Sequence, residues 1–162
     1  MKTPFFTLVF LTVLYSFSAN GQCVGPITLS SQADVNAFPS TYGCTELSGT
    51  LTISGNDITN LDSLHHLTKV DMDLFITNNH NLSNLTGLSL LTYVGAGGGP
   101  YPGAHITDNP KLINLDGLNN LTTIAGLLEI SNNATLTNMD GISSLQSIGS
   151  PAPSYESLII NN

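Results

Sequence analysis

Few side chains in this sequence are spaced as catalytic chemistry requires. The chain holds two cysteines, four histidines and 11 acidic residues. It has no Gly-x-Ser-x-Gly nucleophile elbow, no phosphate-binding loop and no His-Glu-x-x-His zinc motif. Two cysteines alone cannot supply the four ligands of a structural zinc site. We therefore expect a protein that is not an enzyme and that holds no cofactor.

The histidines and acids do not converge on an obvious metal site. His65 and His66 are adjacent, so on an extended strand their rings point to opposite faces. Oxygen ligands for Ca²⁺ are conceivable at four aspartates, but no Asp-rich loop recurs along the chain. An acidic, solubilising surface is the favoured interpretation. The four aspartates are Asp57, Asp71, Asp73 and Asp108.

The charge balance excludes one class of partner. Lys and Arg total 3 against 11 acidic residues, for a net charge of −8. Nothing in the sequence would neutralise phosphates, so we expect no nucleic-acid partner. Lys2 and the apolar run at 5–15 predict a signal peptide over residues 1–21; the run is shorter than the roughly 20 residues that span a bilayer. The alternative is a buried core segment.

Export bears on the cysteines, because a secreted chain meets an oxidising compartment. An even cysteine count then predicts a disulfide between Cys23 and Cys44. In the chain-entropy model such a loop contributes about 3 kcal/mol. The alternative is a lipoprotein acylated at Cys23. The preceding residues lack the apolar-then-small pattern, however, and acylation would leave Cys44 unpaired. We expect a secreted or cell-surface protein without a transmembrane segment in its mature part.

An internal repeat is the strongest signal in the sequence. It reads I-x-x-N-x-x-L-x-N-L-x-G-L-x-x-L-x-x-I and occurs four times, and a fifth copy begins at Leu158. Asn, Gly and Thr lie inside every copy, and the apolar spacing does not follow a helical stripe. Stacked copies would share one core, with L-x-I as a parallel strand. We predict a mainly β solenoid over 51–162. The aligned isoleucines are Ile53, Ile76, Ile106, Ile130 and Ile160.

Two asparagine columns run through the repeats. An Asn side chain donates and accepts, so it can satisfy backbone groups at a tight corner and bond to the next copy. We predict a structural role for both columns; a row of ligand-binding amides is the alternative. The first column is Asn56, Asn79, Asn109 and Asn133, and the second is Asn60, Asn84, Asn114 and Asn138.

Residues 22–50 are predicted to form an N-terminal cap. Ser31 is a plausible N-cap residue, Asp34 follows three residues later, and Pro39 is expected just beyond the helix end. This pattern predicts a short helix over residues 31–38 that covers the open end of the repeats. The two cysteines flank it and would hold it in place.

The segment from Cys44 to Ile53, Cys-Thr-Glu-Leu-Ser-Gly-Thr-Leu-Thr-Ile, resembles the start of the receptor L domain, the ligand-binding module of insulin- and EGF-receptor ectodomains. Together with Cys23 and the short helix, the resemblance covers residues 23–162. It implies a right-handed, leucine-rich-repeat-like β-solenoid similar to the L-domain-type proteins that many bacteria secrete. The receptor role does not transfer, because the chain has no Cys-rich module and no kinase. The open end at Asn162 predicts either further coils or a domain beyond it, or a partner that covers it.

A partner is expected on the sheet surface. The central residue of each L-x-I strand faces outward, and we call these residues the outward row. The residues after the Ile column form a second, mostly hydroxyl row. The outward row is Thr52, Phe75, His105, Glu129 and Ile159, and the hydroxyl row is Ser54, Thr77, Thr107, Ser131 and Asn161. Phe75 would offer an exposed aromatic ring, or else contact a neighbouring loop.

Two repeats are longer than the others at the same corner, with inserts at 95–105 and 149–157. Each insert carries one tyrosine, Tyr101 or Tyr155, a residue that gives large contact area at little entropic cost. We predict a contact patch beside the outward row; tolerated loop insertions are the alternative. The sequence thus indicates a module that recognises a protein or a glycan. The competing function is a structural spacer or an adhesin repeat.

Overall fold

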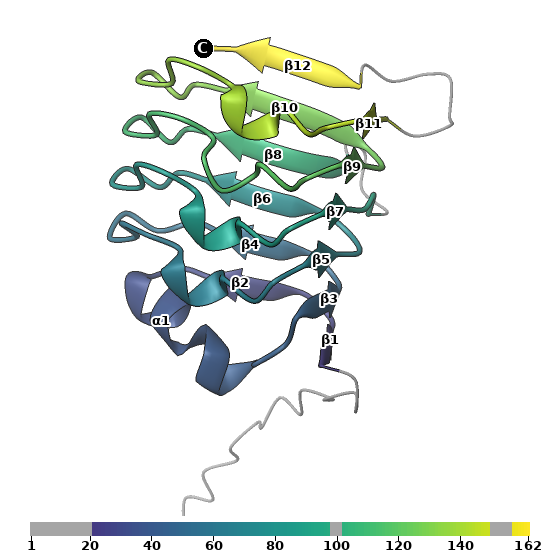
Figure 1. Cartoon of the computed structure of the whole chain (residues 1–162). Helices are drawn as coiled ribbons and strands as arrows, with labels where there is room; N and C mark the ends of the chain where they lie inside the picture. Colours follow the sequence, from purple (N-terminus) through teal and green to yellow (C-terminus); the bar gives the residue numbers. More distant parts are fainter. Residues whose placement is uncertain (1–20, 98–101, 150–156) are drawn as a thin grey trace, which may run out of the picture.

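The computed structural model describes residues 21–97, 102–149 and 157–162. The expected signal peptide therefore lies outside the described residues except for Gly21. Within them the protein is mainly β, with two parallel sheets and one α-helix (Figure 1). Successive strands along the chain alternate between the sheets, so one sheet holds the odd-numbered strands and the other the even-numbered strands.

The odd-numbered sheet consists of short strands. In order they are β1 (Gln22–Val24), β3 (Glu46–Ser48), β5 (Lys69–Val70), β7 (Tyr93–Val94), β9 (Thr123–Ile124) and β11 (Ser147–Ile148). The strands of the even-numbered sheet are β2 (Ile27–Leu29), β4 (Leu51–Ile53), β6 (Leu74–Thr77), β8 (Gly103–Thr107), β10 (Leu127–Ser131) and β12 (Leu158–Asn161).

The register of the even-numbered sheet follows the repeat. The five isoleucines aligned in the sequence pair directly, each with the next, from Ile53 on β4 to Ile160 on β12. A one-residue slip would turn every apolar side chain of a strand to the other face, so burial of one face fixes this register. The sheet therefore sets side chains at one repeat position about 4.8 Å apart.

The core lies between the two sheets and, among the described residues, is aliphatic apart from Phe38 and the cysteines Cys23 and Cys44. It is built from the Leu, Ile and Val columns, most of which are at most 1% exposed. Full burial of one such side chain contributes about 1.5–3 kcal/mol. Burial falls at the C-terminal strand, where Leu158 and Ile160 are 47% and 42% exposed.

Glycines in the repeat mark close contact between successive copies. Three of the connections contain 3₁₀ turns, which are η1 (Asp62–Leu64), η2 (Thr86–Leu88) and η3 (Asp140–Ile142). A Cβ on Gly87 would lie 1.8 Å from the carbonyl oxygen of Leu61, and one on Gly117 would lie 1.8 Å from that of Leu85. The backbones can therefore stack at this spacing only because these residues lack a side chain.

The predicted helix is present but longer than expected. α1 spans Gln32–Thr41, and the hydroxyl of Ser31 caps it by accepting the backbone N–H of Asp34 at 3.1 Å. The expected end before Pro39 is wrong, because Pro39 lies inside the helix. The helix continues past the proline, and the backbone N–H groups of Tyr42 and Gly43 both reach the carbonyl oxygen of Phe38.

The predicted disulfide is confirmed: Cys23 and Cys44 are bonded, with their Cα atoms 5.6 Å apart. It joins β1 to the segment between α1 and β3. The segment assigned to a cap does more than cover an end, because β1 pairs with β3 and β2 pairs with β4. Residues 22–29 thus contribute the first strand of each sheet, and α1 lies beside β2 (Figure 1).

Candidate functional site

The outward row forms a continuous line across the even-numbered sheet. Thr52 pairs with Phe75, Phe75 with His105, His105 with Glu129, and Glu129 with Ile159. Thr28 on β2 extends the row by one strand, because it pairs with Thr52. The row places an aromatic ring, an imidazole and a carboxylate on three neighbouring strands.

These three central side chains hold one another in place. The rings of Phe75 and His105 are stacked, with centroids 4.8 Å apart and planes 18° from parallel. Nδ1 of His105 lies 2.9 Å from Oε2 of Glu129. The hydroxyl of Ser131 donates to Oε1 of Glu129 at 3.1 Å. The group is therefore ordered before any ligand arrives.

The expectation that His105 faces the solvent needs correction. Its ring occupies the outer side of the sheet, but the residue is only 6% exposed. Phe75 covers one of its faces, and Glu129 bonds to its edge. A ligand would meet the half-buried Phe75 and Glu129, together with the half-buried Ile159 at the end of the row.

The same group does not resemble an activated serine. In a catalytic triad the serine donates to an imidazole, which the carboxylate then orients. Here Ser131 donates directly to the carboxylate of Glu129. The geometry fits a rigid display of polar and aromatic groups.

Asp73 ties the first insert to the outer side of the even-numbered sheet. Its Oδ1 accepts backbone N–H groups from Gly97 and Gly103, both at 2.8 Å, and the residue is only 8% exposed. The carboxylate thus fixes the two ends of the insert next to the Phe75 strand. Tyr101 and Tyr155, the predicted contact residues of the two inserts, lie outside the described residues.

The four aspartates considered for Ca²⁺ are engaged elsewhere. Asp71 pairs with Lys69 at 2.7 Å, Asp57 accepts the backbone N–H of Gln32, and Asp108 accepts the side chain of Asn132. Asp73 holds the insert. In the parts of the chain that the structure describes, no three His, Cys, Asp or Glu side chains cluster as metal ligands.

Three of the four residues of the first asparagine column form a buried row. The side-chain Oδ1 of Asn109 accepts the backbone N–H and the Nδ2–H of Asn79, at 3.1 and 3.0 Å. Asn133 receives the same two bonds from Asn109. Asn79, Asn109 and Asn133 are 0% exposed. We call these three residues the asparagine row; the side chain of Asn162 extends it by accepting the backbone N–H of Asn133.

Asn56 does not join this row. It is exposed, and its Oδ1 contacts Nδ1 of His80 at 2.6 Å. The first repeat is one residue shorter at this corner, so the backbone N–H of Gly55 meets Oδ1 of Asn79 instead. The left-handed backbone conformation at this corner is not adopted by a residue of either Asn column. It occurs at the residue before the asparagine row, with φ near +57° at Asn78, Asp108 and Asn132.

The second asparagine column has a local role. In each repeat the Oδ1 atom accepts the backbone N–H two residues later at 3.2 Å, which starts the turn that follows. The four residues are half-buried or exposed. They are Asn60, Asn84, Asn114 and Asn138.

The two adjacent histidines are not on a strand, so the expectation of opposed rings is wrong. They follow the 3₁₀ turn η1, and the centroids of His65 and His66 lie 3.9 Å apart. Nδ1 of His65 contacts the carbonyl oxygen of Asp62 at 2.7 Å.

A second outward row lies on the odd-numbered sheet and escaped sequence reasoning. Lys69 pairs with Tyr93 across β5 and β7, and its Nζ lies 5.2 Å from the centre of the tyrosine ring. The hydrogen bond from Lys69 to Asp71 raises the pKa of the lysine. The sequence carried one sign of this row: a polar or aromatic residue precedes each Val or Ile of the odd-numbered sheet. These strands are only two to three residues long, which hides their periodicity.

Comparison of the chain with protein family models, with curated proteins and with solved structures gave no match. The resemblance to the receptor L domain therefore rests on the sequence features alone. No helix among the described residues is both long and apolar enough to cross a membrane.

Proposed function

We propose that the protein is a non-enzymatic recognition module that acts outside the cell or at its surface. In this proposal the chain is a right-handed, leucine-rich-repeat-like solenoid of the L-domain type. The two parallel sheets with repeat-matched register are compatible with that architecture. The disulfide is compatible with an oxidising, extracellular setting.

One observation carries the proposal: the ordered group of Phe75, His105 and Glu129 on the outer side of the even-numbered sheet. Stacking and hydrogen bonding fix these side chains, so binding would cost little side-chain entropy. An aromatic face beside a carboxylate suits either a sugar ring with hydroxyl groups or a protein surface with a donor and an apolar patch. The tyrosines of the two inserts would add contacts beside this group.

The test uses the disulfide-bonded chain without residues 1–21 on glycan and protein arrays. We expect at least one reproducible ligand. Phe75→Ala should weaken its binding by about 30-fold, the size of an aromatic hot spot. Glu129→Gln should weaken it less. Tyr93→Ala, the matched control on the odd-numbered sheet, should leave binding unchanged.

Two results would count against the proposal. Silence across both arrays favours the structural spacer, in which the repeats only separate other modules. Equal losses for Phe75→Ala and Tyr93→Ala would show that the even-numbered sheet is not the binding surface. A double replacement of Tyr101 and Tyr155 by alanine tests the inserts separately, and unchanged binding would remove them from the site.

A further inference from the structure

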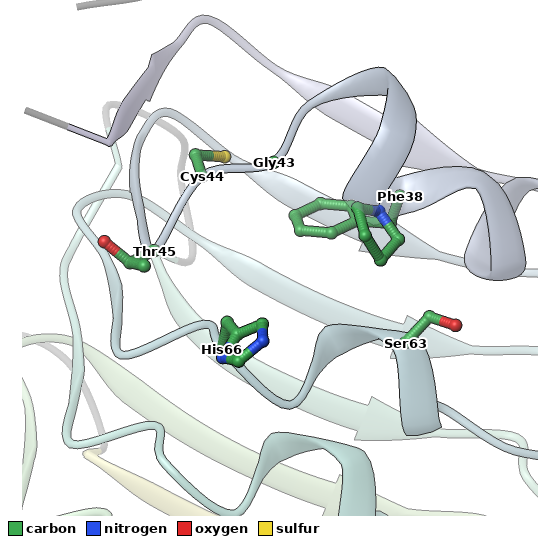
Figure 2. A pocket seen from close by; sticks show the side chains of 7 residues that line it. Phe38, Gly43, Cys44, Thr45, Ser63 and His66 are labelled. Carbon is green, nitrogen blue, oxygen red and sulfur yellow. The ribbon is translucent and has the colours of Figure 1, made fainter. Parts of the chain in front are cut away.

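A small cavity lies at the first repeat, between α1 and η1. Its volume is about 180 Å³. Figure 2 shows the side chains that surround it, which come from α1, from the segment leading to β3, and from η1 and the turn after it. They include Phe38, Pro39, Cys44, Thr45, Ser63 and His66.

The cavity has an apolar floor and a polar rim. Phe38 and Cys44 are each 2% exposed and form the buried part of its wall. Ser63 is half-buried and His66 is exposed. Figure 2 shows the Phe38 ring on one side of the cavity and the His66 ring on the other; Ser63 lies on the His66 side, with its hydroxyl directed away from both rings. A ring held against Phe38 would thus have polar side chains at its edge.

The cavity coincides with a break in the repeat. At the position of Ser63, the later repeats carry Gly87, Gly117 and Gly141, and a Cβ on any of these would collide with a backbone carbonyl. The first repeat instead packs against α1, which leaves room for a side chain. At the position of His66 the later repeats carry Leu90, Asn120 and Ser144, so this position varies between repeats. Ser63 and His66 both line the cavity, and each can form a hydrogen bond there.

Size and charge define the ligand. An engineered protein cavity of about 150 Å³ accommodates one benzene ring, so this cavity has room for a single ring. No lysine or arginine lines it, and the chain carries a net charge of −8, which disfavours an anion. We propose that the cavity binds one neutral phenolic ring, which packs on Phe38 while its hydroxyl group bonds to Ser63 or His66. The proposal is independent of the function assigned to the outward row.

The test titrates the disulfide-bonded chain with p-cresol and toluene and follows the ring protons of His66 by NMR. We expect p-cresol to bind with a Kd of about 1 mM, a typical value for so small a ligand. Toluene, which lacks the hydroxyl, should bind about tenfold more weakly. N-acetyl-tyrosinamide distinguishes the source: binding as tight as p-cresol indicates a tyrosine side chain, and much weaker binding indicates a free phenol.

Variants locate the site. Ser63→Leu fills the cavity and should abolish p-cresol binding, whereas Ser63→Ala keeps the space and should weaken binding by about three- to tenfold. His66→Leu introduces the residue of the next repeat and should also weaken binding. The reverse exchange, Leu90→His, is the matched control and should change nothing. Thermal unfolding of each variant verifies that it is folded.

Three outcomes would overturn the proposal. The first is the absence of any His66 shift up to about ten times the expected Kd. The second is p-cresol binding that persists unchanged in folded Ser63→Leu. The third is equal affinity for toluene and p-cresol, which would remove the role of the hydroxyl.

Discussion

Replacing Asn109 by alanine removes the centre of the asparagine row. The Asn109 side chain accepts two hydrogen bonds from Asn79 and donates to the carbonyl oxygen of Ile76 at 2.8 Å and to Asn133 at 3.2 Å. All three asparagines are 0% exposed, so water cannot replace these bonds without entering the core. The substitution therefore leaves buried polar groups without their partners.

The magnitude follows from counting which groups lose a partner that nothing else replaces. The Nδ2 of Asn79 retains the carbonyl oxygen of Ile53, and the Oδ1 of Asn133 retains the backbone N–H of residue 109. The backbone N–H of Asn79 loses its acceptor, whereas the carbonyl oxygen of Ile76 loses one donor but lies within the ladder between β6 and β8. At about 1–3 kcal/mol for one buried unsatisfied group, Asn109→Ala should destabilise the protein by about 1–3 kcal/mol.

Asn114→Ala is the matched control, because it makes the same chemical change at an exposed turn. It removes the hydrogen bond from the backbone N–H of Asp116 and the bond to that side chain, both accessible to water. The loss should stay below about 1 kcal/mol. Equilibrium denaturation by urea, followed by circular dichroism, measures both values. Equal losses for the two variants, or a loss under about 1 kcal/mol for Asn109→Ala, would refute the structural role of the asparagine row.

Three further predictions concern the fold. Replacing both Cys23 and Cys44 by alanine should lower the free energy of unfolding by about 3 kcal/mol, and a thermal melt unchanged from the parent would contradict this. Gly117→Ala, which puts a Cβ 1.8 Å from a carbonyl oxygen at φ +113°, should cost about 3 kcal/mol by denaturation, whereas Ser63→Gly should cost under about 1. The backbone N–H and the hydroxyls around the Asp34 carboxylate lower its pKa. Its contribution is therefore complete above the ordinary carboxyl pKa and is lost as pH falls through the lowered value; stability of Asp34→Asn should depend less on pH in that acidic range.

The sequence predicted most where one residue type recurs in register. The isoleucine column predicted direct strand pairing, because identical apolar side chains at a fixed interval can be buried together only when the strands align. Two cysteines in a chain that was expected to be exported likewise predicted the bond between Cys23 and Cys44. In both cases a single physical requirement left few alternatives.

The first strands of both sheets were missed for a local reason. Ile27, Thr28 and Leu29 of β2 alternate as the repeat strands do but read I-x-L instead of L-x-I, and α1 replaces the usual turn after them, so the rest of the repeat motif is absent. At Pro39 the prediction failed in a different way, because the helix was expected to end before the proline and instead continues past it. A proline near a helix end removes only one backbone N–H, and the bonds from Tyr42 and Gly43 to Phe38 close the helix beyond it.

The burial of His105 could not be predicted from the sequence of its own strand. Alternation predicts which face of the sheet a side chain occupies, but exposure on that face depends on the neighbouring strands. Phe75 and Glu129 lie on β6 and β10, distant in sequence, and they pair with His105 only after the repeats have stacked. A ring and a carboxylate on either side then cover an imidazole that the pattern alone predicts to be open.

Positions that vary between repeats are the informative ones for function. A column residue such as Asn109 or Gly117 is fixed by its contact with the next copy, so its identity reports stacking and nothing about a ligand. A residue that departs from its column, such as Ser63, escapes that requirement because its neighbour differs. The outward row is under no stacking requirement at all, yet Phe75, His105 and Glu129 form mutual contacts across three strands. Such contacts among variable positions fit selection for a defined surface better than they fit a uniform spacer.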